Sequence, residues 1–356
     1  MGGGSSTTSD PSTSTSYTEF QEHPLLSFIE NPINRFCDDF ASSLLEDVPS
    51  RTTKSDIQVD TVDQEEIYGY TIIKVLGDGA EAIVYEGLKN RTNVPLALKK
   101  YKKVLNMGET GVPREYEISK LLNHPNCIKM YDCIKNVSGE FIISMPLGTH
   151  GALNYSTVPV LTVSSTILFL KQLGSALFHM HSHNVVHRDI KPGNILLNDD
   201  GFVFCDYSVS VHLPSDFEPL SGVVGTSVFM SCEISNNSMY LPKPVDVWAL
   251  GVTVYVLSLG SFPYKLEQAL SESEGQEWNN TAPIQKCVNQ NDLEFPDVPV
   301  LPNELKEVIG GMLEKDPMKR WTAQMIAENE WLNEKCEEWL SILSFMESED
   351  SESSME

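Results

Sequence analysis

The chain has 356 residues, is 41% hydrophobic and carries a formal net charge of −25. This size and apolar content support a substantial core, so we expect a globular enzyme with tails. Phosphate-rich partners are bound by clustered Lys and Arg, so the acidic balance argues against nucleic acid or an anionic membrane surface as the main partner.

The cysteines and the start of the chain bear on its compartment. The 7 cysteines form no C-x-x-C pairs and no apolar signal segment opens the chain, which favours a reducing, cytoplasmic setting. Pro, Gly and hydroxyl residues interrupt the uncharged runs at 151–170 and 247–264, so we predict no stable membrane span. The opening M-G-G-G-S-S matches the N-myristoylation pattern; it would give weak membrane association, and a flexible start is the competing interpretation.

The two ends of the chain are acidic. Residues 1–66 are predicted to be a disordered acidic region, in which apolar residues at helical spacing over 31–45 indicate an amphipathic helix. This helix would dock on the main domain or capture a partner. Residues 333–356 form an acidic C-terminal tail, and a second amphipathic pattern runs into it from Leu332.

Strand patterns fill the region that follows the N-terminal tail. We expect strands at residues 70–76, 82–88, 95–100, 128–134 and 140–145, with a helix at 113–122. Beyond residue 148 the pattern is mainly helical, and the Ser and Thr residues at 164–166 are expected to cap a long helix. A small sheet-rich half therefore precedes a larger helical half.

A glycine-rich turn lies between the first two of these strands. Residues 77–84 read G-D-G-A-E-A-I-V, and the missing side chains of glycine let backbone N–H groups approach phosphates closely. By itself the pattern also suits an ordinary hairpin. The next strand ends in Lys99, which could hold phosphate groups.

Residues 187–197 read H-R-D-I-K-P-G-N-I-L-L. With the glycine-rich turn and Lys99, this stretch resembles the eukaryotic protein kinases of the serine/threonine type, and the resemblance covers about residues 70–332. It implies the two-lobed α+β protein kinase fold, with a β-rich N-lobe at 70–147 and a helical C-lobe at 148–332. It also implies ATP and Mg²⁺ as cofactors, and transfer of the γ-phosphoryl group to protein substrates.

The resemblance implies the following catalytic roles. Asp189 would orient the substrate hydroxyl and accept its proton, and Lys191 would neutralise the moving phosphoryl group. Lys99 would be held by a carboxylate on the next helix. Glu115 is the preferred partner because it lies nine residues before the H-P-N sequence at 124–126, and Glu117 is the alternative.

The metal ligands implied by the resemblance are Asn194 and Asp206. The residues expected to line the nucleotide site are Leu76, Gly77, Asp78, Gly79, Ala80, Glu81, Ala82, Ile83, Val84, Ala97, Lys99, Met145, Leu147 and Leu196.

The chain departs from the family pattern at three places. Ala82 replaces a glycine, Asp206-Tyr207-Ser208 replaces D-F-G, and S-C-E at 231–233 replaces A-P-E. A side chain on Ser208 disfavours positive φ, so we hypothesise that this segment turns outward less readily. The departures keep open an alternative function, a pseudokinase scaffold that binds partners without phosphotransfer.

Three structural expectations also follow from the resemblance. Glu233 is expected to form a buried ion pair with Arg320, and Asp246 is expected to anchor the backbone of the 187–197 stretch. His187 is expected to be a core residue rather than an acid or base.

The C-terminal half is most similar to calcium/calmodulin-dependent protein kinase kinases and, more distantly, to LKB-type kinases, which implies an upstream kinase acting on other kinases. Val209, a β-branched residue after the D-F-G position, indicates Thr as the preferred acceptor. Gly193 leaves no carboxylate to demand a basic residue upstream of the acceptor. The pattern after Trp331 is acidic, so calmodulin is not expected as a partner.

Overall fold

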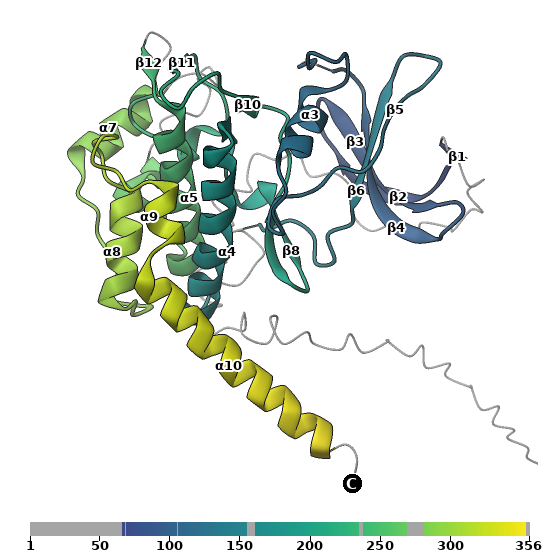
Figure 1. The fold of residues 1–356 in the computed structure, drawn as a ribbon. Helices are drawn as coiled ribbons and strands as arrows, with labels where there is room; N and C mark the ends of the chain where they lie inside the picture. The colour runs from purple at the N-terminus through teal and green to yellow at the C-terminus, as the bar shows by residue number, and fades with distance from the viewer. Residues whose placement is uncertain are drawn as a thin grey trace, which may run out of the picture.

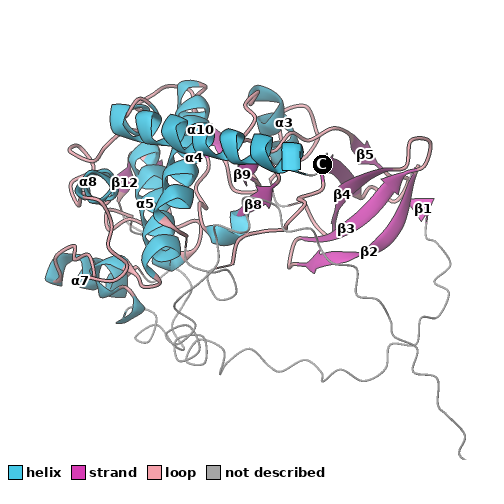
Figure 2. Ribbon diagram, turned by 90° about the horizontal axis from the view of Figure 1, so that it is seen from below, coloured by secondary structure: helices cyan, strands magenta, loops and turns pink. Residues whose placement is uncertain are grey.

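The computed structural model describes residues 66–67, 69–104, 106–154, 161–234, 238–268 and 281–353. A 6-stranded sheet and one helix form one lobe, and the remaining helices with several short strands form the other, as Figure 1 and Figure 2 show. The predicted two-lobed α+β architecture is therefore confirmed. The predicted helix at 31–45 and the myristoylation pattern lie outside the described residues.

The N-lobe is built on an antiparallel sheet with the strand order β1-β2-β3-β4-β6-β5. The neighbouring β2, β3 and β4 follow one another directly in the chain, so short turns suffice to connect them. The strands are β1 (Glu66–Ile67), β2 (Tyr70–Asp78), β3 (Ala82–Lys89), β4 (Val94–Tyr101), β5 (Cys133–Lys135) and β6 (Phe141–Pro146).

Two sheet boundaries differ from the predictions. Glu66 pairs with Thr71, so the sheet begins inside the region predicted as disordered. The strand predicted at 128–134 was wrong over most of its length, since β5 starts at Cys133. The backbone N–H of Ile128 donates to the carbonyl of Phe204, and hydrogen bonds to β6 begin only at Tyr131, whose N–H donates to the carbonyl of Ser144 at 2.8 Å.

The N-lobe also contains α3 (Arg114–Leu121), close to its predicted range. One face of α3 is buried through Glu115, Ile118 and Ser119. The helix therefore presents a carboxylate toward the sheet.

The C-lobe consists mainly of helices (Figure 1). These are α4 (Val163–Ser182), α5 (Pro242–Leu259), α7 (Ala282–Gln290), α8 (Asn303–Met312), α9 (Ala323–Ala327) and α10 (Glu330–Ser353). The short strands are β7 (Val185–Val186), β8 (Ile195–Asn198), β9 (Gly201–Phe204), β10 (Val211–His212), β11 (Leu220–Ser221) and β12 (Met239–Tyr240), and 3₁₀ turns lie at Pro192–Asn194, Ser227–Phe229 and Pro263–Lys265.

The predicted cap of the long helix was wrong by two residues. Thr162 is the N-cap of α4, and its hydroxyl accepts a hydrogen bond of 3.2 Å from the backbone N–H of Ser165. Three hydroxyl residues in a row follow the true cap, so spacing alone did not single it out.

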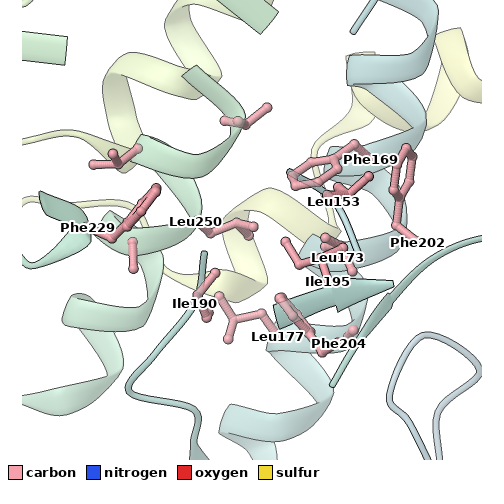
Figure 3. Packing of buried hydrophobic residues seen from close by; sticks show 14 of the residues in the cluster. Leu153, Phe169, Leu173, Leu177, Ile190, Ile195, Phe202, Phe204, Phe229 and Leu250 are labelled. Carbon is pink, nitrogen blue, oxygen red and sulfur yellow. The ribbon is translucent and has the colours of Figure 1, made fainter. Parts of the chain in front are cut away.

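The apolar core of the C-lobe supports the 187–197 stretch from below. Figure 3 shows Leu173 and Leu177 of α4 and Leu250 of α5 packing with Ile190 and Ile195. All five side chains are at most 1% exposed. Buried apolar side chains on both sides of the motif hold its backbone in one position.

Helix α10 covers the start of the amphipathic pattern predicted from Leu332 onward. Leu332 and Cys336 are buried, and the first turns of α10 contact α4. The later turns run away from the C-lobe (Figure 1). In the part of the chain that the structure describes, none of the helices combines the length and apolarity needed to cross a membrane.

Candidate active site

Lys99 lies between two carboxylates. Its ammonium group is 2.8 Å from Glu115 Oε1 and 2.9 Å from Asp206 Oδ1. β4 carries Lys99, α3 carries Glu115, and the segment after β9 supplies Asp206. The alternative partner, Glu117, instead accepts hydrogen bonds from the backbone N–H groups of the loop at 109–110. The ion pair is thus formed by the preferred residue.

The two carboxylates differ in burial, and their pKa values move in opposite directions. Burial raises the pKa of Glu115 to about 7; Lys99 opposes this rise and Asp206 reinforces it. Burial acts the same way on Asp206, but the charge and hydrogen bond of Lys99 hold its pKa below the usual range. For Lys99, burial alone would lower the pKa, and the two carboxylates raise it instead. Of Lys99, Glu115 and Asp206, Glu115 is therefore the group that titrates near neutral pH.

Asp189 lies at the centre of a second group of polar side chains. Lys191 Nζ is 2.9 Å from Asp189 Oδ2, and Asn194 Nδ2 donates to the same oxygen at 2.9 Å. Asn194 Nδ2 also donates to the backbone carbonyl of Asp189 at 2.8 Å. The structure therefore brings together three residues that the sequence motif places within six positions.

Thr226 is a member of this group that the sequence reasoning did not assign. Its hydroxyl donates to Asp189 Oδ1 at 2.8 Å and accepts from Lys191 Nζ at 2.7 Å. The sequence signal that could have pointed to Thr226 is the glycine before it. Gly225 has a φ of +105°, which residues with a side chain rarely adopt. A Cβ there would lie 2.4 Å from the carbonyl oxygen of Arg188, so only glycine lets Thr226 approach.

Asp246 anchors the backbone of the motif, as predicted. Its carboxylate accepts hydrogen bonds of 2.8 Å from the backbone N–H groups of both His187 and Arg188. The His181 ring contacts the same carboxylate at 3.0 Å. Asp246 and His187 are 0% exposed, so the prediction that His187 is a core residue is confirmed.

The predicted nucleotide-lining residues come from facing positions of the sheet and from the C-lobe. Val84 is paired with Lys99, and Ala97 is paired with Met145. Leu147 and Leu196 are partly buried against the main core, and Gly148 lies close to Leu196, where an added Cβ would be 3.3 Å from its methyl groups. Leu76 is 44% exposed at the end of β2.

The glycine-rich turn is closed by local hydrogen bonds. The N–H of Gly79 donates to the Ala82 carbonyl at 3.0 Å. Lys102, just past β4, donates to the Gly79 carbonyl at 2.8 Å and pairs with Asp78. The backbone N–H of Lys102 also donates to the carbonyl of Glu81 at 2.8 Å. The turn is therefore held to the chain that follows β4.

Asn194 and Asp206 fit the ligand preferences of Mg²⁺. Both offer oxygen atoms, which Mg²⁺ prefers, and Asn194 uses its amide nitrogen on Asp189, which leaves the amide oxygen for a cation. Within the described ranges, no three His, Cys, Asp or Glu side chains cluster closely enough to hold a metal. Mg²⁺ usually takes several of its ligands from water and substrate phosphates.

The Asp206-Tyr207-Ser208 segment is held inward. Tyr207 is 0% exposed, and the N–H of Ser208 lies 3.3 Å from Asp206 Oδ1. Asp206 itself has a positive φ of 61°, which costs backbone energy that the surrounding contacts must offset.

The segment that ends in S-C-E at 231–233 is fixed by an ion pair, as predicted. Arg320 donates to the two carboxylate oxygens of Glu233 at 2.6 and 3.0 Å. The Arg320 side chain is 0% exposed. A buried bidentate pair of this kind holds the segment even though Ser231 and Cys232 replace the usual A-P.

Comparison with known proteins assigns the chain to a family. The model of the protein kinase domain matches residues 70–332. The chain belongs to the eukaryotic protein kinase family, serine/threonine type.

Three curated relatives illustrate the similarity. The chain is 28% identical over 272 residues to serine/threonine-protein kinase GL21140 of Drosophila persimilis, covering 74% of this chain and 34% of the relative. It is 30% identical over 280 residues to serine/threonine-protein kinase MARK-A of Dictyostelium discoideum, covering 76% and 24%. It is 28% identical over 227 residues to the calcium/calmodulin-dependent protein kinase kinase of Caenorhabditis elegans, covering 62% and 40%. The match thus spans two fifths or less of each relative's length.

Proposed function

We propose that this chain transfers the γ-phosphoryl group of Mg-ATP to a hydroxyl group of a protein substrate. The observation that carries the proposal is the group formed by Asp189, Lys191, Asn194 and Thr226, which lies on a buried core. The backbone N–H of Cys205, the residue before Asp206, donates to the carbonyl of Asn194 at 3.0 Å, which joins this group to the segment that carries Asp206. Phosphoryl transfer passes through a loose transition state that asks mainly for positioning and charge, and these residues offer both.

In this reaction the substrate oxygen bonds to the γ-phosphorus while the bond to the β–γ bridging oxygen breaks, and ADP leaves. Asp189 orients the hydroxyl and accepts its proton. Lys191, held by Asp189 and Thr226, neutralises charge on the transferring group.

Lys99 binds the α and β phosphates, and Glu115 keeps its ammonium group in place. Asn194 and Asp206 would hold Mg²⁺, which supplies charge neutralisation on the phosphates when bound.

The test is transfer of radiolabelled phosphate from ATP to protein substrates by the purified chain. Lys99→Met and Asp206→Asn are the controls, because each removes one charge from the nucleotide site and leaves the Asp189 group intact. Transfer by wild type that both variants lose supports the proposal. Absence of transfer to any protein substrate by wild type favours the alternative, a pseudokinase scaffold.

We further propose that the substrates include other kinases and that Thr is the preferred acceptor. The relative named a calcium/calmodulin-dependent protein kinase kinase supports the first part, and Val209 supports the second. Catalytically inactive kinase domains, each prepared with Thr or Ser at the same activation-loop position, test both parts together. Equal rates on Thr and Ser contradict the acceptor preference, and rates no higher than on a generic protein substrate contradict the upstream role.

A further inference from the structure

The loop between β4 and α3 makes a direct contact with the segment that carries Asp206. The side-chain amide of Asn106 donates to the backbone carbonyl of Ser208 at 2.9 Å. The two residues are 102 positions apart in the chain and lie on different lobes. Asn106 lies outside the motifs at 77–84, 187–197, 206–208 and 231–233.

Asn106 is also fixed to the start of α3. Its backbone carbonyl accepts a hydrogen bond of 2.9 Å from the N–H of Arg114, the first residue of the helix. This carbonyl bond satisfies one of the N–H groups that a helix start leaves without an intrahelical partner. One residue thus contacts both the helix that carries Glu115 and the segment that carries Asp206.

Hydrogen bonds within the loop and to α3 link the position of Asn106 to that of the helix. Gly108 donates to the Val112 carbonyl at 2.7 Å, and Met107 is bridged to Pro113. The Glu117 carboxylate, on α3, accepts from the backbone of the 109–110 loop. A shift of α3 therefore moves Asn106, and Asn106 moves the carbonyl of Ser208.

The contact also bears on the orientation of Asp206. An outward turn of the segment would carry the Ser208 carbonyl away from Asn106 and would separate Asp206 from Lys99. Ser208 lines a small cavity together with Asn106, Glu115 and Tyr101. Two residues thus connect the segment that carries Asp206 to the region of α3. Lys99 contacts Asp206 and Glu115, and Asn106 contacts Ser208 and Arg114.

We propose that Asn106 is a positioning residue that couples the helix bearing Glu115 to the segment bearing Asp206, and so keeps both on Lys99 at once. The proposal deepens the proposed function, since it rests on the assignment of Lys99, Glu115 and Asp206 to Mg-ATP. Asn106 is not assigned to nucleotide or metal binding. It acts through the Ser208 carbonyl.

Hydrogen–deuterium exchange of the full chain without nucleotide tests the coupling independently of catalysis. Asn106→Ala removes one hydrogen bond, so exchange in peptides covering 204–210 should rise about fivefold. Asn106→Asp, which keeps the shape and replaces the donor with an acceptor, should raise it at least as much. Met107→Ala, in the same loop, is the matched control and should leave 204–210 unchanged. Wild-type exchange at 204–210 in both Asn106 variants overturns the proposal.

A second arm uses wild type with Mg²⁺ and a non-hydrolysable ATP analogue. Binding should slow exchange at both 204–210 and 106–113, and the effect at 106–113 should be lost in Asn106→Ala. Slower exchange at 204–210 alone overturns the coupling. If the analogue protects neither segment, the proposed function fails, and the nucleotide-free arm still decides the role of Asn106.

Activity provides the third readout. If nucleotide binding holds, kcat/KM for ATP should fall about fivefold in Asn106→Ala and stay within twofold of wild type in Met107→Ala. An unchanged kcat/KM in Asn106→Ala overturns the positioning role.

Discussion

At the scale of single residues, the pKa of Glu115 has consequences for both activity and stability. Burial raises this pKa to about 7 from the usual value of 4.5. As the pH falls from 8 to 6, the folded protein therefore takes up a proton that the unfolded chain does not. A neutral Glu115 no longer pairs with the charged Lys99.

Lowering the pH from 8 to 6 is accordingly expected to reduce phosphotransfer but to raise the contribution of Glu115 to stability. The raised folded-state pKa means that this contribution is complete below about pH 4.5 and is lost as the pH rises through about 7. Wild type should thus gain free energy of unfolding relative to Glu115→Gln on going from pH 8 to 6. Denaturant unfolding at both pH values measures this, and parallel pH trends for the two proteins would contradict it.

Thr226 is the second residue whose chemistry predicts an effect. Thr226→Val keeps the shape but removes the hydroxyl that Asp189 and Lys191 share. Hydrogen bonds to charged groups contribute about 1.5–3 kcal/mol, so kcat should fall by about tenfold to hundredfold while the KM for ATP changes little. Thr226→Ser keeps the hydroxyl and should retain most of the activity. Equal loss in both variants would indicate a packing role instead.

At the scale of elements, α10 is part of the C-lobe rather than a loose tail. Leu332 is 0% exposed and Cys336 is 4% exposed, and Trp339 packs against the same core. The first turns of α10 therefore pack on the catalytic domain.

Leu332→Ala should lower the free energy of unfolding by about 2–5 kcal/mol, since it leaves a cavity in a closed core. Glu334→Ala, on an exposed position of the same helix, should stay within about 0.5 kcal/mol of wild type. Chemical denaturation of both variants makes the comparison. A loss below about 1 kcal/mol for Leu332→Ala would show that α10 is dispensable for the fold.

At the scale of the whole molecule, the sequence was sufficient to predict those groups of residues that lie a few positions apart and whose residue types the chemistry requires. Asp189, Lys191 and Asn194 lie within one short motif, and that motif was enough to place the three together. The Lys99 and Glu115 pair was reached in the same way, because both lie near recognisable patterns. The change of hydrophobic period along the chain predicted a sheet-rich half before a helical half, and the resemblance to protein kinases implied the two-lobed fold.

The errors and omissions came from contacts between distant segments. The extended strand predicted at 128–134 failed because Ile128 bonds to Phe204 instead of to β6. Thr226 was missed because its contact with Asp189 spans 37 positions and depends on the path of the chain between Asp206 and Glu233. Local patterning carries no information on such pairings.

The direction of α10 affects how the protein can be handled. The described end of α10 lies below β8, which begins directly after Asn194, and apart from α3, which carries Glu115 (Figure 1). A biosensor surface or an affinity tag joined to this end would therefore stand clear of the residues assigned to nucleotide and substrate. Nucleotide affinity measured on protein immobilised through its C-terminus should equal the value in solution, whereas attachment through Lys102, beside the glycine-rich turn, should weaken it.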